Sequence, residues 1–343
     1  METPKQYDDI DGIIRPSQNN QLYGHKKIID SIKRMREERR LHHALLFEGP
    51  QGIGKATLAF QLAWNIITDS PDGFITPDEE SPIWRQIAQA SHPAVLHLTR
   101  RYDAKTERFA TGITVDDVRE INRFLGQTSY DGGWRVVIVD TADDMNRAAA
   151  NGILKTLEEP PEKTLFILIS HFSGRLLPTI RSRCHSVEFR ALEYSDMHSA
   201  LNHVLANQLP PAAELDAIIA EASGSVRKAA LLLCYGGMEI IRTQQEIFAQ
   251  PTFDSAKAQS VAQALAGREA VIQFQQFCEN LLGILADKAK QFAFAGNINS
   301  AKEYSELWNE VSREIGQTES FNLDKKQFII NVLYKCHKVI NRP

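Results

Sequence analysis

The sequence lacks the features that mark several large classes of protein. Its 343 residues include only four cysteines, none of them in a CxxC pair: Cys184, Cys234, Cys278 and Cys336. Their wide separation argues against a disulfide scaffold and against a cysteine zinc site, and it favours a reducing cytoplasm. No apolar run reaches the ~18 to 20 residues that span a bilayer, and the polar, acidic start lacks the apolar segment of a signal peptide. We therefore expect a cytoplasmic protein without zinc and without a membrane span.

The balance of charge also excludes some partners. The net charge is −4 and the isoelectric point is about 6.2, so the molecule as a whole is not a cationic DNA-binding protein. A nucleic-acid contact would have to come from a local patch or from a partner subunit. Hydrophobic residues make up 43% of the chain, which is enough for real hydrophobic cores, and the length favours two or three domains.

The first half of the chain alternates between strand and helix patterns. Short apolar runs predict buried strands at 44–47, 94–98, 134–139 and 165–169. Apolar residues at helical spacing predict helices at 26–40, 57–67, 115–124 and 143–159. This alternation is typical of an α/β domain in which helices cover both faces of a parallel sheet.

The second half of the chain is predicted to be helical throughout. Short helices are expected between 193 and 235, and apolar stripes at helical spacing run from about 255 to the end. We therefore predict three domains: an α/β domain at 1–190, a small helical domain at 191–245 and an all-helical domain at 246–343.

A glycine-rich loop follows the first predicted strand. The segment Gly49 to Thr57 has the sequence GPQGIGKAT, and Gly49, Gly52, Gly54 and Lys55 match a phosphate-binding loop. Such a loop needs glycines so that backbone N–H groups can close around phosphate oxygens, and its lysine neutralises the β- and γ-phosphates. Its position between a predicted strand and a predicted helix supports ATP as a ligand.

The residue after the lysine departs from the pattern of this loop. A serine or threonine hydroxyl normally ligates Mg²⁺ there, but the chain has Ala56. Thr57 supplies a hydroxyl one residue later, which is about 100° around the helix. We expect Thr57 to contribute to nucleotide binding and Mg²⁺ to bind weakly or not at all.

A second nucleotide element lies at the end of a buried strand. Four apolar residues lead to Asp140, which the strand places at the carboxyl edge of the sheet, where ligands of such sheets bind. The next residue is Thr141 in place of a water-activating glutamate, and threonine is no general base at neutral pH. Asp143 and Asp144 are alternatives, but we interpret them as acidic residues in the first turn of the 143–159 helix. Hydrolysis is therefore expected to be impaired.

Several motifs between Leu22 and about Arg190 are specific to one family. These are the Gly24-centred segment 22–25, the segment 42–47 before the loop, the segment NGILKTLEEPP at 151–161 and the segment LPTIRSRC at 177–184. Together they resemble AAA+ clamp-loader subunits of bacterial DNA polymerase III. Within that group the chain is more similar to the delta-prime subunits than to the tau/gamma motor subunits. The motor subunits keep Ser or Thr after the loop lysine and an acid after the strand aspartate, and they usually have a four-cysteine zinc module.

The resemblance implies an architecture and partners. It implies a RecA-like AAA+ domain, a helical lid and a helical collar, with five subunits in a ring and ATP sites between neighbours. The implied partners are the tau/gamma motor subunits and the delta subunit, with the sliding clamp and primer–template DNA contacted through the complex. The implied role is that of a subunit with little or no ATPase activity inside a DNA-directed DNA polymerase holoenzyme.

The resemblance also assigns roles to single residues. Arg183 matches an arginine finger that acts in trans on the γ-phosphate bound by a neighbouring motor subunit. Arg181 is a second arginine in the same motif, but the register favours Arg183. Ser170, at a strand end, matches a nucleotide-sensing position, and Arg227 matches a lid arginine that contacts nucleotide. A local hydrogen bond for Ser170 and an ordinary surface charge for Arg227 remain alternatives.

Two further functions remain open from the sequence. One is an active motor ATPase, against which Ala56 and Thr141 argue. The other is a P-loop kinase or other small-molecule phosphotransferase. The LPTIRSRC segment and the long helical second half argue against the kinase function. A kinase would also need an acceptor pocket, and none can be identified in the sequence.

Overall fold

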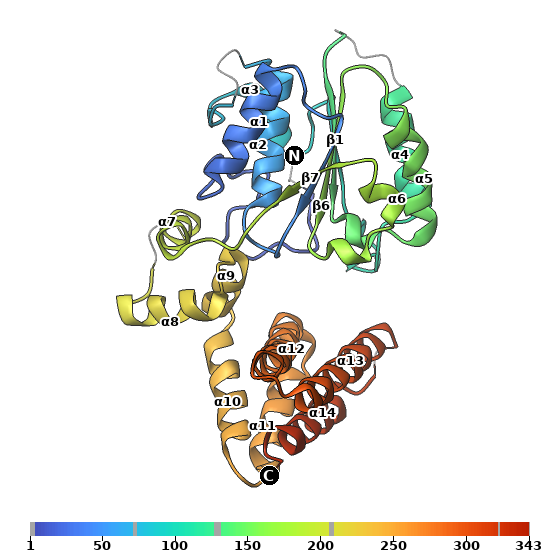
Figure 1. The fold of residues 1–343 in the computed structure, drawn as a ribbon. Helices are drawn as coiled ribbons and strands as arrows, with labels where there is room; N and C mark the ends of the chain where they lie inside the picture. Colours follow the sequence, from blue (N-terminus) through green and yellow to red (C-terminus); the bar gives the residue numbers. More distant parts are fainter. Residues whose placement is uncertain (1–3, 71–73, 127–131, 206–208, 322, 343) are drawn as a thin grey trace. The chain divides into compact units, whose positions relative to one another are not determined.

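The structure is a computed structural model that describes residues 4–70, 74–126, 132–205, 209–321 and 323–342 (Figure 1). The chain forms two compact units, residues 1–230 and residues 231–343. The first unit contains all of the β-structure among the described residues, and the second is helical. The predicted α/β domain followed by helical regions is confirmed. The three domain boundaries remain a prediction.

A parallel five-stranded sheet forms the centre of the first unit. Its strands lie in the order β2-β5-β6-β1-β7, and every neighbouring pair is parallel. The strands are β1 (Ala44–Glu48), β2 (Val95–Leu98), β5 (Arg135–Asp140), β6 (Thr164–Ser170) and β7 (His185–Glu188). The central strand β6 is buried along its whole length, which explains why it is apolar on both faces.

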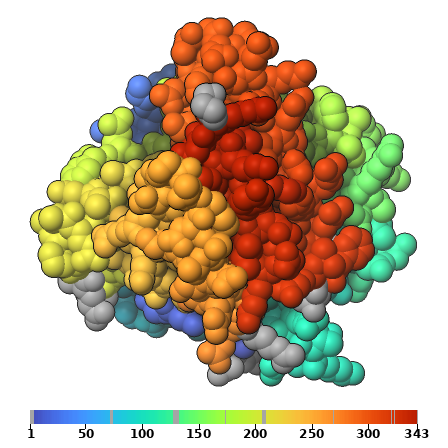
Figure 2. Space-filling model, turned by 90° about the horizontal axis from the view of Figure 1, so that it is seen from below, coloured from blue at the N-terminus to red at the C-terminus, as the bar shows by residue number. Residues whose placement is uncertain are grey.

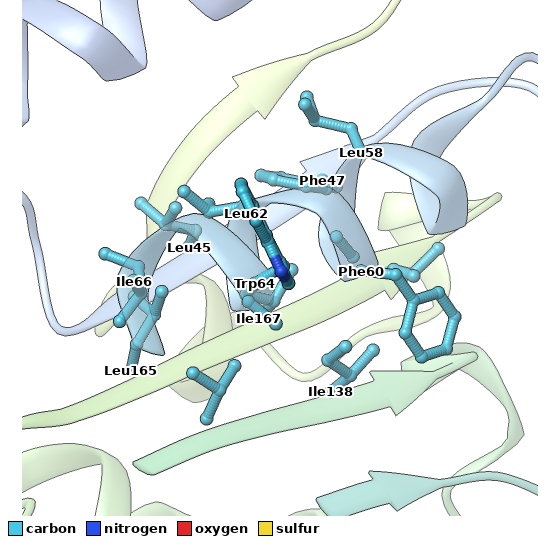
Figure 3. Packing of buried hydrophobic residues seen from close by; sticks show 14 of the residues in the cluster. Leu45, Phe47, Leu58, Phe60, Leu62, Trp64, Ile66, Ile138, Leu165 and Ile167 are labelled. Atoms are coloured by element: carbon cyan, nitrogen blue, oxygen red, sulfur yellow. The ribbon is translucent and has the colours of Figure 1, made fainter. Parts of the chain in front are cut away.

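Helices cover both faces of this sheet (Figure 1). On one side lie α1 (Lys26–Glu37), α2 (Lys55–Ile67) and α3 (Pro82–Ala88). On the other lie α4 (Val115–Gly126), α5 (Arg147–Glu158) and α6 (Pro178–Arg181). Alternate strand residues point to opposite faces, so Leu45 and Phe47 join the core with α2, whereas Ala44 and Leu46 join the core with α5. Figure 3 shows Leu62 and Ile66 of α2 packed over Leu165 of β6.

Three kinds of element in this unit were not predicted. Helix α3 begins at Pro82 with Ser81 as its N-cap. A two-stranded hairpin forms from β3 (Tyr102–Asp103) and β4 (Arg108–Phe109), which are too short to give a periodic signal. Strand β7 pairs with β1, but only Val187 in it is buried, so the sequence shows no apolar run there. Apart from these, short single turns occur at Ala142–Asp144 and Ser173–Arg175 in this unit and at Arg268–Ala270 in the second.

Three helices follow the sheet, and their packing against the loop matters for the site. They are α7 (Tyr194–Val204), α8 (Ala212–Ala222) and α9 (Val226–Cys234), of which α9 contains the point that divides the two units. Buried side chains such as Met197 and Leu201 come from the apolar face of α7. No strand follows residue 190 among the described residues, as predicted.

The second unit is an assembly of helices with its own core. Its helices after α9 are α10 (Gly237–Ala249), α11 (Ser255–Leu265), α12 (Val271–Phe294), α13 (Ile298–Ser320) and α14 (Lys325–Ile340). Phe274, Phe277 and Leu281 form the predicted stripe of α12 and are buried. Figure 2 shows the orange surface of α11 beside the red surface of α14, which are packed against each other. Within the described residues, no helix combines the length and apolar character that crossing a membrane requires.

Candidate nucleotide-binding site

The phosphate-binding loop adopts backbone conformations that require glycine. Gly52 has a φ of +76°, and a Cβ built there would lie 2.3 Å from the Cβ of Arg227. Gly54 has a φ of +102° and forms the N-cap of α2. Both values lie in the region that residues with a Cβ avoid. The loop therefore delivers the N-terminus of α2 to the carboxyl edge of the sheet, where its free N–H groups favour an anion.

Lys55 lies inside this loop and is 3% exposed. Its Nζ donates hydrogen bonds to the carbonyl of Gly49 at 2.6 Å and to the carbonyl of Pro50. Burial lowers the pKa of Lys55 to about 8, against the opposing charges of Asp140 and Asp143. Both acceptors of the ammonium are neutral backbone carbonyls. A negatively charged phosphate oxygen is a stronger acceptor and can replace them.

Asp140 ends strand β5 at the same edge of the sheet, as predicted. Burial raises the pKa of Asp140, whereas the neighbouring His97 and the positive charge of Lys55 lower it, and the net shift is downward. The His97 Nε2 lies 3.9 Å from a carboxylate oxygen of Asp140, which is too long for a hydrogen bond. An ionised carboxylate therefore lies beside the loop lysine.

The predicted role of Asp143 and Asp144 in the first turn of a helix is wrong. Helix α5 begins only at Arg147, with Asn146 as its N-cap, and the two aspartates lie in a separate single turn. Asn146 accepts a hydrogen bond from the Ala149 N–H at 2.9 Å, which makes it the better start for the helix. The sequence pattern could not separate these two starts because both are polar.

Asp143 instead connects the ends of two strands. It accepts hydrogen bonds from the Ser170 hydroxyl at 2.8 Å and from the backbone N–H groups of His171 and Phe172. Ser170 is fully buried and is not among the described residues that line the nearby cavity. The next residue, His171, does line it. The local hydrogen bond considered for Ser170 is therefore present. A carboxylate with three donors is also a poor general base.

The lid side of the site is formed by the start of α9. The Ser225 hydroxyl donates to the Gln51 carbonyl at 2.8 Å, and the Arg227 N–H donates to the Gly52 carbonyl at 3.3 Å. The Arg227 guanidinium also donates to the carbonyl of Asp8. The fold thus brings Arg227 to the phosphate-binding loop, from which it is distant in the sequence.

A cavity lies between the loop, the sheet edge, α9 and the N-terminal segment. Its polar end contains Gly52, Gly54, Lys55, Thr57, Asp140, His171 and Arg227. Its apolar side contains Ile10, Ile13, Leu22, Val204 and Val226. A polar end with phosphate-binding groups beside an apolar region fits a nucleotide with its base. Gly49 lies behind the loop, where a Cβ would clash with the Phe189 carbonyl at 2.4 Å.

Two parts of this site were not identified from the sequence. His171 follows a strand end without any motif, and burial lowers the pKa of His171 to about 4. Residues 8–16 contain no motif, yet Asp8, Asp9 and Ile10 line the cavity. No periodic pattern marks such a segment, so only the tertiary structure reveals it.

The donor set does not fit a P-loop magnesium site. Ala56 has no oxygen to offer, and the described residues that line the cavity include no glutamate. No group of three His, Cys, Asp or Glu side chains in the described part of the chain could hold a metal ion.

Arg183 lies elsewhere on the first unit. It is not among the described residues that line the cavity. Its Nε donates to Oε1 of Glu158 at 2.8 Å, and its Nη1 donates to the Thr179 carbonyl at 2.9 Å. The side chain remains 31% exposed. Arg181 is more exposed, and its Nε lies 4.0 Å from a carboxylate oxygen of Glu48.

Comparison with known proteins identifies relatives of this chain. A family model described as DNA polymerase III, delta subunit, matches residues 24–193. The DNA polymerase III subunit delta' of Pseudomonas aeruginosa is 34% identical over 249 residues, which cover 71% of each chain. The tau/gamma subunit of Haemophilus influenzae is 29% identical over 220 residues, covering 62% of this chain and 30% of that protein.

A solved structure also aligns along most of the chain. It is a gamma subunit-related protein of DNA polymerase III from Thermotoga maritima, with a TM-score of 0.46 and 16% sequence identity. The alignment covers 91% of this chain and 99% of that one.

Proposed function

This chain belongs to the delta' family of DNA polymerase III subunits, and on that premise we propose that it acts in clamp loading during DNA replication. In this proposal it supplies Arg183 in trans to the ATP site of a neighbouring tau/gamma motor subunit. Its partners are those motor subunits and the delta subunit. The sliding clamp and primer–template DNA are contacted through the assembled complex.

The position of Arg183 is the observation that supports this role most. The side chain lies outside its own cavity, is partly exposed, and is oriented by Glu158 and Thr179. A planar guanidinium offers several N–H donors and a delocalised charge, which match the charge that spreads over a transferring phosphoryl group. An oriented arginine that cannot serve its own nucleotide is suited to serve that of another subunit.

The chain's own site supports binding without efficient hydrolysis. The side chain of Ala56 has no oxygen with which to ligate Mg²⁺. Thr141 is buried and cannot act as a general base, and Asp143 already accepts three hydrogen bonds. His171 is neutral near pH 7 because its pKa is about 4. Such a weak base is poorly suited to remove a proton from the attacking water. The loop would retain nucleotide as a structural ligand.

The decisive experiment is ATP turnover by a reconstituted clamp loader on primed DNA. We expect Arg183→Ala to lower kcat by about 10³, the lower end of the range seen for arginine fingers. Arg181→Ala is the matched control, since it removes the adjacent arginine of the same segment, and it should have a small effect. Normal turnover with Arg183→Ala would eliminate the finger role.

Turnover by the isolated chain separates this proposal from an active motor ATPase. We expect almost no release of phosphate from ATP by the chain alone. Vigorous turnover would instead favour the motor function and would mean that another residue replaces the missing glutamate.

A further inference from the structure

The N-terminal segment 8–16 forms one wall of the cavity, and we call it the N-terminal wall. Asp8, Ile10, Ile13 and Arg15 of this wall line the cavity together with residues of the phosphate-binding loop. Ile10 is buried, and Asp9 forms an ion pair with Arg15 at 2.7 Å. The family match begins at residue 24, so the wall lies outside the segment that identifies the family.

The wall is attached to the α/β domain immediately before Asp8. The guanidinium of Arg100 lies 4.5 Å from the centre of the Tyr7 ring, and the Arg100 Nε donates to Asp144 at 2.6 Å. The Tyr7 ring also meets Phe109 edge-on. These contacts fix the backbone of Tyr7, and with it the position of Asp8, against the carboxyl edge of the sheet.

Asp8 contributes a carboxylate to the phosphate end of the cavity. Burial and the nearby charge of Asp140 together raise the pKa of Asp8 to about 6, against the opposing charge of Arg227. Asp8 is therefore ionised at pH 8. Arg227 is attracted to this carboxylate and donates to the Asp8 carbonyl.

Two cationic and two anionic residues, Lys55, Arg227, Asp8 and Asp140, line the cavity here. Lys55 lies in the field of Asp140, and Arg227 lies in the field of Asp8. A loop lysine and a strand-end aspartate of this type surround the β- and γ-phosphates of a bound triphosphate. A γ-phosphate would thus be repelled by the carboxylates of Asp8 and Asp140. Because Ala56 offers no metal ligand, no bound Mg²⁺ would offset this negative charge.

We propose that Asp8 makes this site selective for a nucleoside diphosphate over the triphosphate. The loop N–H groups and Lys55 still bind the α- and β-phosphates, and the apolar side of the cavity accepts the base. Asp8 lines the cavity as an anion that a third phosphate would have to approach. This inference rests on the part of the proposed function in which the loop retains nucleotide, and it does not involve Arg183.

The test is fluorescence titration of the full-length chain with N-methylanthraniloyl ADP and ATP at pH 8, with and without Mg²⁺. We expect the wild-type chain to bind the diphosphate about tenfold more tightly than the triphosphate, which corresponds to a repulsion of about 1.4 kcal/mol and lies between the values for two like charges about 4 Å apart in bulk water and near a protein surface. Asp8→Asn should reduce this ratio about tenfold by tightening the triphosphate. Asp11→Asn removes an exposed charge of the same segment that is not among the described residues lining the cavity, and it should leave the ratio unchanged.

Three results would overturn the inference. They are equal or tighter binding of the triphosphate by the wild-type chain, binding of neither nucleotide, and an unchanged ratio in Asp8→Asn. The wild-type ratio decides the question even if a variant fails to fold. None of these results bears on the Arg183 experiment, whose readout is the turnover of the neighbouring subunit.

Discussion

Arg183 and Glu158 form an ion pair in which two guanidinium nitrogens, Nε and Nη2, donate to the same carboxylate oxygen. Glu158 is the last residue of α5, and Arg183 follows α6, so the pair joins two segments that both resemble clamp-loader motifs. The Thr179 carbonyl accepts from the third nitrogen at 2.9 Å. The guanidinium is therefore oriented by its own chain before any neighbour is present.

This pair predicts that Glu158 positions the finger. In a reconstituted loader, we expect Glu158→Ala to lower the kcat of ATP turnover about tenfold and to leave KM for ATP nearly unchanged, because misorienting a catalytic group costs rate more than binding. Steady-state turnover on primed DNA measures both constants. The unfolding free energy should change by less than about 1 kcal/mol, as for other exposed ion pairs.

Glu159→Ala is the control for this prediction, because Glu159 is the next residue and is exposed. It should leave kcat unchanged. Equal kcat values for Glu158→Ala and the wild-type chain would show that the ion pair is incidental to the finger.

A second prediction concerns the contact between the loop and the lid helix. Gly52→Ala should destabilise the first unit by about 1 to 3 kcal/mol, because the new methyl group would overlap Arg227 and Ser225 and because φ is +76°. Chemical denaturation followed by circular dichroism measures the change, and titration with a fluorescent nucleotide should show weaker binding.

Gly283→Ala provides the opposite case. Gly283 lies inside α12, is exposed, and has open space around its Cα. Alanine there should stabilise the second unit by about 0.5 to 1 kcal/mol. A stabilising effect of Gly52→Ala, like that expected for Gly283→Ala, would contradict the clash with Arg227.

The sequence predicted the elements whose pattern is local and missed those defined by distant contacts. Four of the five strands of the sheet, β1, β2, β5 and β6, follow from apolar runs, and the start of α2 follows from the loop glycines, so Lys55 and Asp140 lie at the predicted ends of these elements. Strand β7 buries only Val187 and exists because β1 offers it a partner. Residues 8–16 have no periodicity, and they join the site because Tyr7 and Ile10 find tertiary partners. The role of Asp143 depends on hydrogen bonds to a strand 27 and 28 residues away.

A third prediction follows from the low pKa of His171. Its pKa of about 4 in the folded chain lies below its ordinary value of about 6.5, because burial and the charge of Lys55 disfavour the protonated ring. As the pH falls from 6.5 to 4, the unfolded chain takes up a proton that the folded chain refuses, so stability falls. His171→Gln should reduce this loss.

Two measurements check the histidine prediction. Proton NMR of the imidazole signals should contain one ring that titrates near pH 4 and is missing in His171→Gln. Denaturant unfolding at pH 7 and at pH 5 should give a larger loss of stability for the wild-type chain than for the variant. Asp8, whose pKa is raised, acts in the opposite direction and is common to both proteins. A His171 signal that titrates near pH 6.5 would contradict the assigned burial.

The last prediction concerns the residue after the loop lysine. Ala56→Thr places a hydroxyl where a P-loop metal ligand belongs, and we expect Mg²⁺ to tighten nucleotide binding several-fold in this variant but not in the wild-type chain. Ala56→Val has the same shape without the oxygen and should remain insensitive to Mg²⁺. Titrations in Mg²⁺ and in chelator measure the difference. Turnover should stay low even in Ala56→Thr, because Thr141 is buried and no described residue of the cavity lining is a glutamate. If the threonine variant alone restored rapid hydrolysis, the missing glutamate would not be what limits this site.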